Sequence, residues 1–244
     1  MNDKKDKYST HQIAEHAGVC LNTVRNYEKH GFISKPVRDS NGYRIFTDTH
    51  KLQMTVCPLI FSPPYINNII RKSSMQVIYA AGKEDFGLCK EQTEKYIIII
   101  ENELRKANEA VEALKNFCKP KRKNIYYDRK ESAAIIGTTV ETIRNWKRNG
   151  LIISEKRNRK SVYNQSEIDF MRLIYILLIS GFGIQNIYDS LMFLRDADNE
   201  QAVEALCDSH SYIELERIEE NIIEKIKEVL TSAHKIRDLL EKNI

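Results

Sequence analysis

GVCLNTVRNYEKHGFI, residues 18–33, recurs as GTTVETIRNWKRNGLI at residues 137–152. The two copies align without a gap, and their separation is too long for a solenoid repeat, so the pattern indicates a duplicated domain. The 244 residues are enough for two units of roughly 120 residues, each able to bury its own core. Whatever one copy does, the protein is expected to do in two places.

Composition and charge narrow the class of protein. Charged residues make up 30% and hydrophobic residues 42%, with only 9 Gly and 5 Pro, which is typical of a helix-rich globular chain. Lys and Arg cluster in residues 119–123 and 147–160 within a formal net charge of +4, and such clusters favour a polyanionic partner. No apolar run approaches the ~18 residues of a membrane span, and no signal peptide is evident. We therefore expect a mostly α, cytoplasmic protein that does not enter a membrane.

The repeated stretch and its flanks predict two helices followed by a β-hairpin. In the first copy, one helix begins at Thr10 and ends near Gly18, and a second runs from just after Cys20 to about His30. Residues 32–36 and 43–46 alternate like strands, and residues 39–42 between them contain the Asn-Gly hairpin signal. The second copy predicts helices 129–136 and 140–149, with Thr139 as N-cap, and strands 152–156 and 161–163.

Each copy continues through further helices into a long helix with a coiled-coil seam. The further helices are expected at 47–60 and 64–71, and at 166–180 and 184–194. Apolar residues spaced by three and four predict the seams at Ile97, Ile100, Leu104, Ala107, Val111, Leu114 and Cys118, and at Leu215, Ile218, Ile222, Ile226, Val229, Ala233, Ile236 and Leu240. The expected organisation is a first helix-pair and hairpin unit in 1–75, a connection and long helix in 76–118, a basic linker in 119–125, a second helix-pair and hairpin unit in 126–196, and a connection and long helix in 197–244.

The repeat resembles the winged-helix DNA-binding domain of the MerR family of bacterial transcription regulators. The resemblance rests on Gly18-Val19, Thr23-Val24-Arg25, Tyr27-Glu28, Gly31-Phe32-Ile33, Gly42-Tyr43-Arg44 and Phe46. It extends over residues 8–70 and again over 126–194. It implies two winged helix-turn-helix domains, each followed by a long coiled-coil helix, with the two long helices packed antiparallel. Double-stranded DNA would be the partner, with the second helix of each pair in the major groove.

Residues of the second helix in each pair are candidates for DNA contact, because amide, hydroxyl and carboxylate groups can read base edges while cations hold phosphates. The candidate base contacts are Asn22, Thr23, Asn26, Glu141, Thr142 and Asn145, and the candidate phosphate contacts are Arg25, Lys29, Arg144, Lys147 and Arg148. The resemblance adds Tyr27, Trp146, Arg38, Tyr43, Arg44, Arg157, Arg159 and Lys160. Tyr27 and Trp146 have core packing as an equal alternative, and Ser161 replaces Arg44 in the second copy.

A single chain with both copies could imitate a family dimer. Helix 92–118 would pair antiparallel with helix 212–240, giving a monomeric pseudo-dimer that reads two unlike half-sites. The resemblance implies regulation of RNA polymerase by deformation of promoter DNA. The alternatives are a homodimer with four DNA-binding domains, an excisionase-like or architectural DNA-bending protein, and a protein-interaction module.

Five cysteines show neither CxxC nor Cys/His ligand spacing, so no disulfide framework, metal site or cofactor is predicted. Cys89 and Cys207 precede the long helices and Cys118 ends the first one, near positions where metal-sensing relatives carry cysteines. A thiol sensor at these three residues is the alternative to buried structural thiols. No phosphate-binding glycine loop, HExxH or nucleophile elbow is present, so no catalytic residue and no enzymatic activity are expected.

Overall fold

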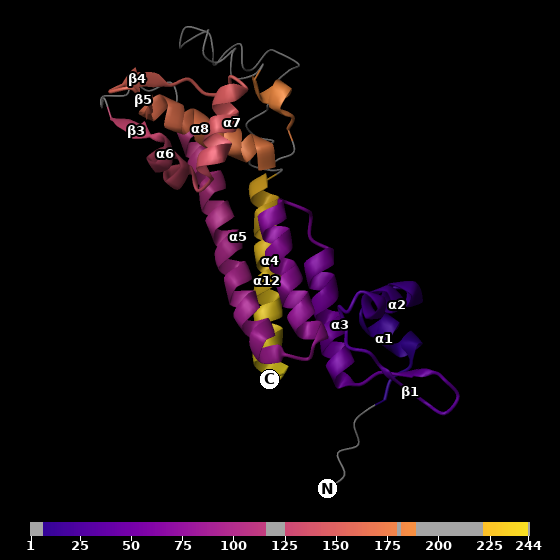
Figure 1. Ribbon diagram of the computed structural model, residues 1–244. Helices are drawn as coiled ribbons and strands as arrows, with labels where there is room; N and C mark the ends of the chain where they lie inside the picture. Colours follow the sequence, from indigo (N-terminus) through magenta and orange to yellow (C-terminus); the bar gives the residue numbers. More distant parts are fainter. Residues whose placement is uncertain (1–6, 116–124, 180–181, 189–221, 244) are drawn as a thin grey trace. The chain divides into compact units, whose positions relative to one another are not determined.

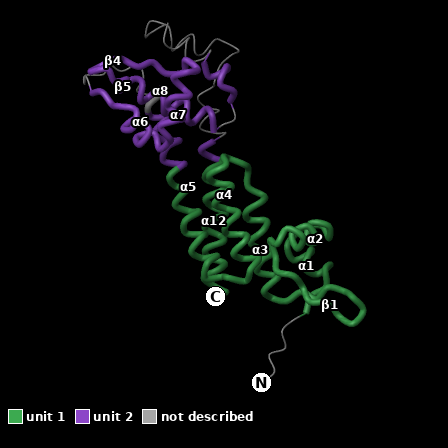
Figure 2. The backbone as a smooth tube through the Cα atoms, in the orientation of Figure 1, with its two compact units in different colours: residues 1–102, 225–244 green, residues 103–224 purple. Residues whose placement is uncertain are grey.

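The computed structural model describes residues 7–115, 125–179, 182–188 and 222–243 (Figure 1). The chain divides into two compact units, Met1–Asn102 with Lys225–Ile244 as unit 1 and Glu103–Glu224 as unit 2 (Figure 2). The described residues are mostly helical, as the composition predicts. Among the helices of these ranges, none is both long and apolar enough to cross a bilayer.

Unit 1 begins with the predicted helix pair. Helix α1 (Thr10–His16) starts at Ser9, whose hydroxyl accepts from the backbone N–H of Gln12 while the Gln12 side chain accepts from the Ser9 N–H. The chain turns at Gly18, where φ is +63°, a conformation that glycine adopts without the steric cost of a Cβ. Helix α2 (Leu21–Lys29) follows. Both predicted helices are confirmed to within two residues at each end.

The hairpin after α2 differs from the predicted one in its first strand. Strand β1 (Val37–Arg38) pairs antiparallel with β2 (Arg44–Ile45), and the Asp39 carboxylate accepts from the backbone N–H groups of Asn41 and Tyr43 in the turn. The strand predicted at 32–36 was wrong. Ile33 and Pro36 are buried, and the backbone N–H of Ser34 donates to Gln53 Oε1 at 3.0 Å instead of to a strand partner.

Two further helices and two long helices complete unit 1. Helix α3 (Asp48–Phe61) confirms the prediction for 47–60, but α4 (Asn68–Gly82) starts later and runs longer than predicted, because the Asn67 side chain accepts from the Ile70 N–H and caps it. Helix α5 (Phe86–Lys115) supplies residues to both units. Helix α12 (Glu224–Asn243) lies beside α4 and α5 (Figure 1), and side chains of all three line one cavity.

All but one of the predicted seam residues whose side chains the structure describes are buried. On α5 the buried seam residues are Ile97, Ile100, Ala107 and Val111, and on the closing segment they are Ile222, Ile226, Val229, Ala233, Ile236 and Leu240. Leu104 is half-buried. The structure describes neither the side chain of Leu114 nor the residues Cys118, Leu215 and Ile218, so the prediction for these four positions is not tested. Most of the helix predicted at 184–194 also lies outside the described residues, and residues 184–188 of it are helical.

Unit 2 repeats the helix pair and its hairpin and adds one strand. Its elements are β3 (Tyr126–Asp128), α6 (Arg129–Ile136), α7 (Val140–Arg148), β4 (Glu155–Arg157), β5 (Lys160–Asn164) and α8 (Gln165–Ile179). Strand β5 lies between β3 and β4. Helix α6 has the predicted bounds, and Thr139 caps α7 as predicted. The prediction of a strand at 152–156 was shifted, because Ile152 is buried in the core instead, and β3 was not predicted at all.

The two copies bury equivalent side chains. In unit 1, α1, α2, the hairpin and α3 close around one apolar cluster. The aligned positions of unit 2 are also buried, which shows that the duplicated sequence specifies the same core twice. The equivalent buried pairs are Ala14 and Ala133, Val24 and Ile143, Ile33 and Ile152, Phe46 and Tyr163, and Met54 and Met171.

Candidate nucleic-acid interface

Helices α2 and α7 each present one polar face to solvent. On α2 the exposed residues Asn22, Arg25, Asn26 and Lys29 follow i, i+3, i+4, i+7 spacing, which places them on one side of the helix. On α7 the same spacing and exposure recur at Glu141, Arg144, Asn145 and Arg148. The opposite faces bury Val24 in α2 and Ile143 with Trp146 in α7. These four residues of each helix, all predicted to contact DNA, therefore lie on its solvent-exposed face.

Thr23 and Thr142 are less accessible than the residues around them. Both are half-buried. The Thr23 hydroxyl lies 3.2 Å from Cys20 Sγ, and the Thr142 hydroxyl lies 2.8 Å from that of Thr139. These local contacts engage the two hydroxyls at the start of each helix, where Cys20 and Thr139 stand at the N-caps.

The two exposed faces differ in charge. Arg144 donates to the Glu141 carboxylate at 2.8 Å, and Arg148 lies 3.6 Å from the same group. The hydrogen bond from Arg144 is the main cause that lowers the pKa of Glu141. On α2 the position of Glu141 is taken by Asn22, and within the described ranges Arg25 and Lys29 have no acidic partner. The first helix thus offers two unpaired cations, whereas the second has a carboxylate between its two.

A second difference concerns the contact between helix and hairpin. In the first copy Glu28 accepts from Arg44 Nε at 2.6 Å, and both side chains are largely buried. In the second copy Lys147 stands in place of Glu28, and its ammonium donates to Ser154 at 2.6 Å and to Ser161 at 3.1 Å. Ser161 is the residue that replaces Arg44. Each copy therefore joins its second helix to its hairpin, by the Glu28–Arg44 pair in the first copy and by the Lys147–Ser161 contact in the second. We call this the coupled replacement, because both partners differ between the copies. Alignment of the two copies shows both differences, but not that the two positions are in contact.

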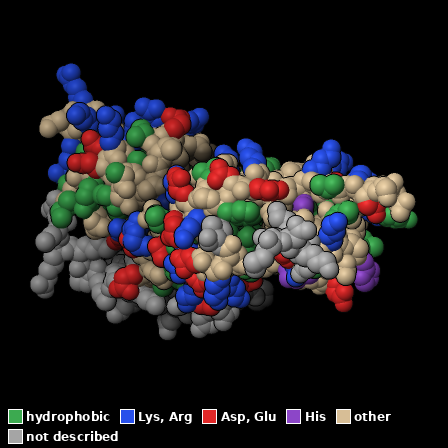
Figure 3. Space-filling model, turned by 90° about the horizontal axis from the view of Figure 1, so that it is seen from below, with side chains coloured by type: hydrophobic (Ala, Val, Ile, Leu, Met, Phe, Trp, Pro, Cys, Tyr) green, Lys and Arg blue, Asp and Glu red, His purple; other side chains and the backbone are tan. Residues whose placement is uncertain are grey.

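The hairpin tips expose basic and aromatic groups. In the first copy Tyr43 is exposed, and the Arg38 guanidinium donates to the Gly42 carbonyl at 2.8 Å. In the second, Arg159 and Lys160 are exposed, while Arg157 lies over the Tyr126 ring at 3.3 Å from its centroid. Lys and Arg side chains are spread over the face seen in Figure 3 with acidic groups between them.

The two aromatic candidates pack inside the units. Tyr27 is half-buried, stacks on Phe61 at 5.5 Å between centroids and contacts Phe32 at 5.9 Å. Its burial raises the pKa of the Tyr27 hydroxyl to about 12. Trp146 is only 2% exposed. Packing is thus the better interpretation for both side chains.

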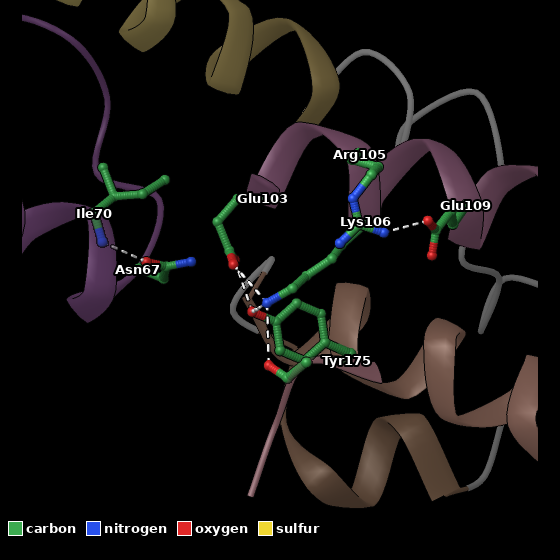
Figure 4. Close-up of polar contacts among 8 residues, drawn as sticks. Asn67, Ile70, Glu103, Arg105, Lys106, Glu109 and Tyr175 are labelled. Carbon is green, nitrogen blue, oxygen red and sulfur yellow. Dashed lines mark hydrogen bonds and ion pairs between the residues drawn. The ribbon is translucent and has the colours of Figure 1, made fainter. Parts of the chain in front are cut away.

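A buried polar network connects α5 to the turn between α6 and α7 in unit 2 (Figure 4). Lys106 Nζ lies 2.8 Å from the Glu103 carboxylate and donates to the Gly137 carbonyl at 3.1 Å and to Tyr175 Oη at 3.2 Å. Tyr175 in turn donates to Glu103 at 2.7 Å. Burial, followed by that hydrogen bond, raises the pKa of Tyr175, so the phenol remains a donor.

Gly137 has no side chain, and this leaves room for Lys106 to reach the turn between α6 and α7. It has φ of +70°, and a Cβ there would lie 2.6 Å from Lys106 Cε. Sequence reasoning missed the network because Glu103 and Lys106, at i and i+3 on a helix, have the spacing of an ordinary surface pair.

Of the three cysteines proposed as a thiol sensor, the structure describes Cys89, which fits packing better than sensing. Cys89 is fully buried and lies 3.5 Å from the Val77 carbonyl, and burial raises the pKa of its thiol to about 11. Cys118 and Cys207 lie outside the described residues. Across the described part of the chain, no three His, Cys, Asp or Glu side chains are grouped as metal ligands.

Family models match both copies of the repeat. Residues 118–192 match the MerR HTH family regulatory protein model, and residues 9–46 match the MerR family regulatory protein model. Comparison with curated proteins and with solved structures gives no match. The matched ranges contain α1 with α2 and α6 with α7, each with its hairpin. The chain therefore belongs to the MerR family of DNA-binding regulators and carries two tandem MerR-type domains.

Proposed function

We propose that the protein is a monomeric pseudo-dimer that binds double-stranded DNA through α2 and α7, reads two unlike half-sites and deforms promoter DNA for RNA polymerase. The observation that carries this proposal is the pair of exposed faces on α2 and α7, which have equal spacing and different side chains. A helix of this kind fits the major groove, where side chains at its surface meet base edges.

The long helices support the pseudo-dimer. Helix α12 belongs to unit 1 together with the first part of α5, and both bury their apolar seams. In Figure 1 the two helices run in opposite directions. A family dimer would use one such helix from each subunit, whereas here both come from a single chain.

The unlike half-sites follow from the aligned residues of the two helices. Asn22 and Glu141 occupy the same position, and an amide pairs with adenine whereas a carboxylate accepts from cytosine N4. The other proposed base contacts are Thr23, Asn26, Thr142 and Asn145. The proposed phosphate contacts are Arg25, Lys29, Arg144 and Arg148, with Arg38, Tyr43, Arg157, Arg159 and Lys160 from the wings, the hairpins β1–β2 and β4–β5. Arg44 and Lys147 hold each wing to its helix, and Tyr27 and Trp146 support the helices from the core.

Replacing Arg25 by alanine should weaken DNA binding about 10-fold and reduce the slope of log affinity against log salt by about one, because a single phosphate contact is lost. The measurement is fluorescence anisotropy at several salt concentrations, on a duplex selected by the intact protein from a random library. Lys95→Ala is the matched control, since this exposed ammonium pairs with Glu91 on α5. Unchanged affinity and slope for Arg25→Ala would contradict the proposal.

Glu141→Gln tests the proposed base contact in the same experiment. It removes the carboxylate that is proposed to accept from cytosine N4 and that pairs with Arg144 and Arg148, and it introduces an amide of the kind that pairs with adenine. Affinity for the selected duplex should fall about 10-fold, and the preferred base at that position should change from cytosine to adenine. Unchanged affinity and unchanged base preference would show that the carboxylate does not read the DNA.

The pseudo-dimer predicts a particle of 28.5 kDa in solution, because its seams are already covered within one chain. Multi-angle light scattering at micromolar concentration measures this mass directly. A stable particle of twice that mass would favour the homodimer with four DNA-binding domains.

A further inference from the structure

Unit 1 contains a cavity between α3, α4, α5 and α12 that the proposed DNA contacts do not use. Its volume is about 300 Å³, at the lower end of the range of about 300–1,000 Å³ found for small-molecule sites. Aliphatic and aromatic side chains form most of its wall, from Ile60, Phe61, Pro63, Pro64, Tyr65, Ile66, Ile70 and Val229. The polar part comes from Asn67, Arg71, Ser74 and Tyr96.

Among the described residues that line the cavity, Arg71 is the only charged one. Its guanidinium lies over the Phe61 ring at 4.8 Å from the centroid, and no carboxylate in the described part of the chain pairs with it. A cation held against an aromatic face keeps its hydrogen-bond donors available for an anion. The described residues of the wall include no Asp or Glu. The positive charge of Arg71 therefore disfavours cationic ligands.

Tyr96 adds a polar group to the same wall. The residue is 3% exposed and lines the cavity. Burial raises the pKa of this phenol, and the charge of Arg71 opposes that rise. The hydroxyl therefore stays protonated and can donate a hydrogen bond to a ligand in the cavity.

We propose that this cavity binds a small organic anion with an apolar body, an aromatic or branched aliphatic carboxylate. The carboxylate would pair with Arg71, whose planar donors match its two oxygens, and could accept from Tyr96. The apolar body would lie against Ile60, Ile66, Ile70 and Val229.

The cavity wall is connected to the helix proposed to read DNA. Phe61 contributes to the cavity, lies under Arg71 and stacks on Tyr27 of α2. An anion that draws Arg71 away from Phe61 would change the packing of a ring that supports α2. The site thus offers a means by which a metabolite could alter the first DNA-binding unit.

Isothermal titration calorimetry of the full chain, without DNA, tests this proposal with indole-3-acetate as probe and indole-3-acetamide as its neutral match. We expect indole-3-acetate to bind one site with a Kd of about 1 mM or below. The amide should bind at least about 10-fold more weakly, because it lacks the charge that Arg71 recognises. Because no DNA is present, the result is independent of the proposed DNA-binding function.

Variants then locate the site. Arg71→Gln should weaken binding of indole-3-acetate about 10-fold or more, and Tyr96→Phe should weaken it a few-fold. Lys72→Gln is the matched control, since Lys72 is exposed on the same helix and does not line the cavity; its affinity should equal that of the unaltered protein. Circular dichroism verifies that each variant is folded. Equal binding of acid and amide, unaltered binding by folded Arg71→Gln, or no binding of the acid up to ~5 mM would each overturn the proposal.

Discussion

Trp146→Ala should destabilise unit 2 by about 3–5 kcal/mol, the range expected when a large buried aromatic side chain is truncated. Trp146 is the largest fully buried side chain among the described residues. Its loss removes apolar surface from the core and leaves a cavity that the surrounding helices cannot fill without moving. Because α7 carries the second set of proposed DNA contacts, the same change should also weaken binding at the second half-site.

Thermal unfolding followed by calorimetry and by circular dichroism measures this effect. Tryptophan fluorescence cannot be used, because Trp146 is the single tryptophan of the chain. Asn145→Ala is the neighbouring control: Asn145 is exposed, so the free energy of unfolding should change by no more than about 0.5 kcal/mol. A loss below 1 kcal/mol for Trp146→Ala would show that the indole does not support the core as its burial indicates.

Lys106→Met should have an effect of similar size for an electrostatic reason. The substitution keeps most of the side-chain volume but leaves the Glu103 carboxylate, only 3% exposed, without its cation. Removing one partner of a buried ion pair typically costs about 3–5 kcal/mol, because the remaining charge loses its counter-ion in a place with little solvent. Tyr175 still donates to the Glu103 carboxylate, so we expect a loss near the lower end of this range. The Gly137 carbonyl also loses its donor, so the turn between α6 and α7 should loosen.

Arg105→Met is the matched control for this prediction. Arg105 pairs with Glu109 on the same helix, but both side chains are substantially exposed and the pair is visible beside the buried one in Figure 4. An exposed pair contributes at most about 1 kcal/mol. Denaturant unfolding of the two variants compares the pairs directly. Equal losses for both would mean that burial does not strengthen the Glu103–Lys106 pair.

The coupled replacement of Glu28 and Arg44 by Lys147 and Ser161 shows how a duplicated domain diverges. Each copy must hold its hairpin to its second helix, and an ion pair or an ammonium–hydroxyl contact serves that purpose. Changing one partner alone would leave a charge or a donor unsatisfied in a partly buried place. The pair therefore changes together, while exposed residues such as Asn22 and Glu141 can vary independently.

Local signals predicted the helix pairs well. The starts of α1, α6 and α7 depend on capping side chains within a few residues, and their ends depend on glycines that adopt positive φ. The residues that make these interactions lie within the repeated segments 18–33 and 137–152 or within about ten residues of them. The exposed faces of α2 and α7 were predictable for the same reason, because helical periodicity alone separates Arg25 from Val24.

Contacts between distant segments were not predictable in this way. Strand β3 exists because residues 126–128 pair with β5, far along the chain, and Tyr8 bridges to Phe46 in the same manner. The prediction of a strand at 32–36 failed because the Ser34 N–H bonds to the side chain of Gln53, a residue distant in the sequence. Glu103 and Lys106 looked like a surface pair until the fold placed Tyr175 and Gly137 against them.

The sequence by itself determined that this protein has two MerR-like units, where their helix pairs begin and end, and which face of each second helix is polar, because these follow from repeats, caps and periodicity. Only the tertiary structure decided that Arg44 and Lys147 hold the hairpins, that Trp146 is core and that Arg71 faces a cavity without a carboxylate partner. Those roles depend on which groups surround each side chain, and burial by distant residues is what turns a cation from a surface charge into a structural or ligand-binding group.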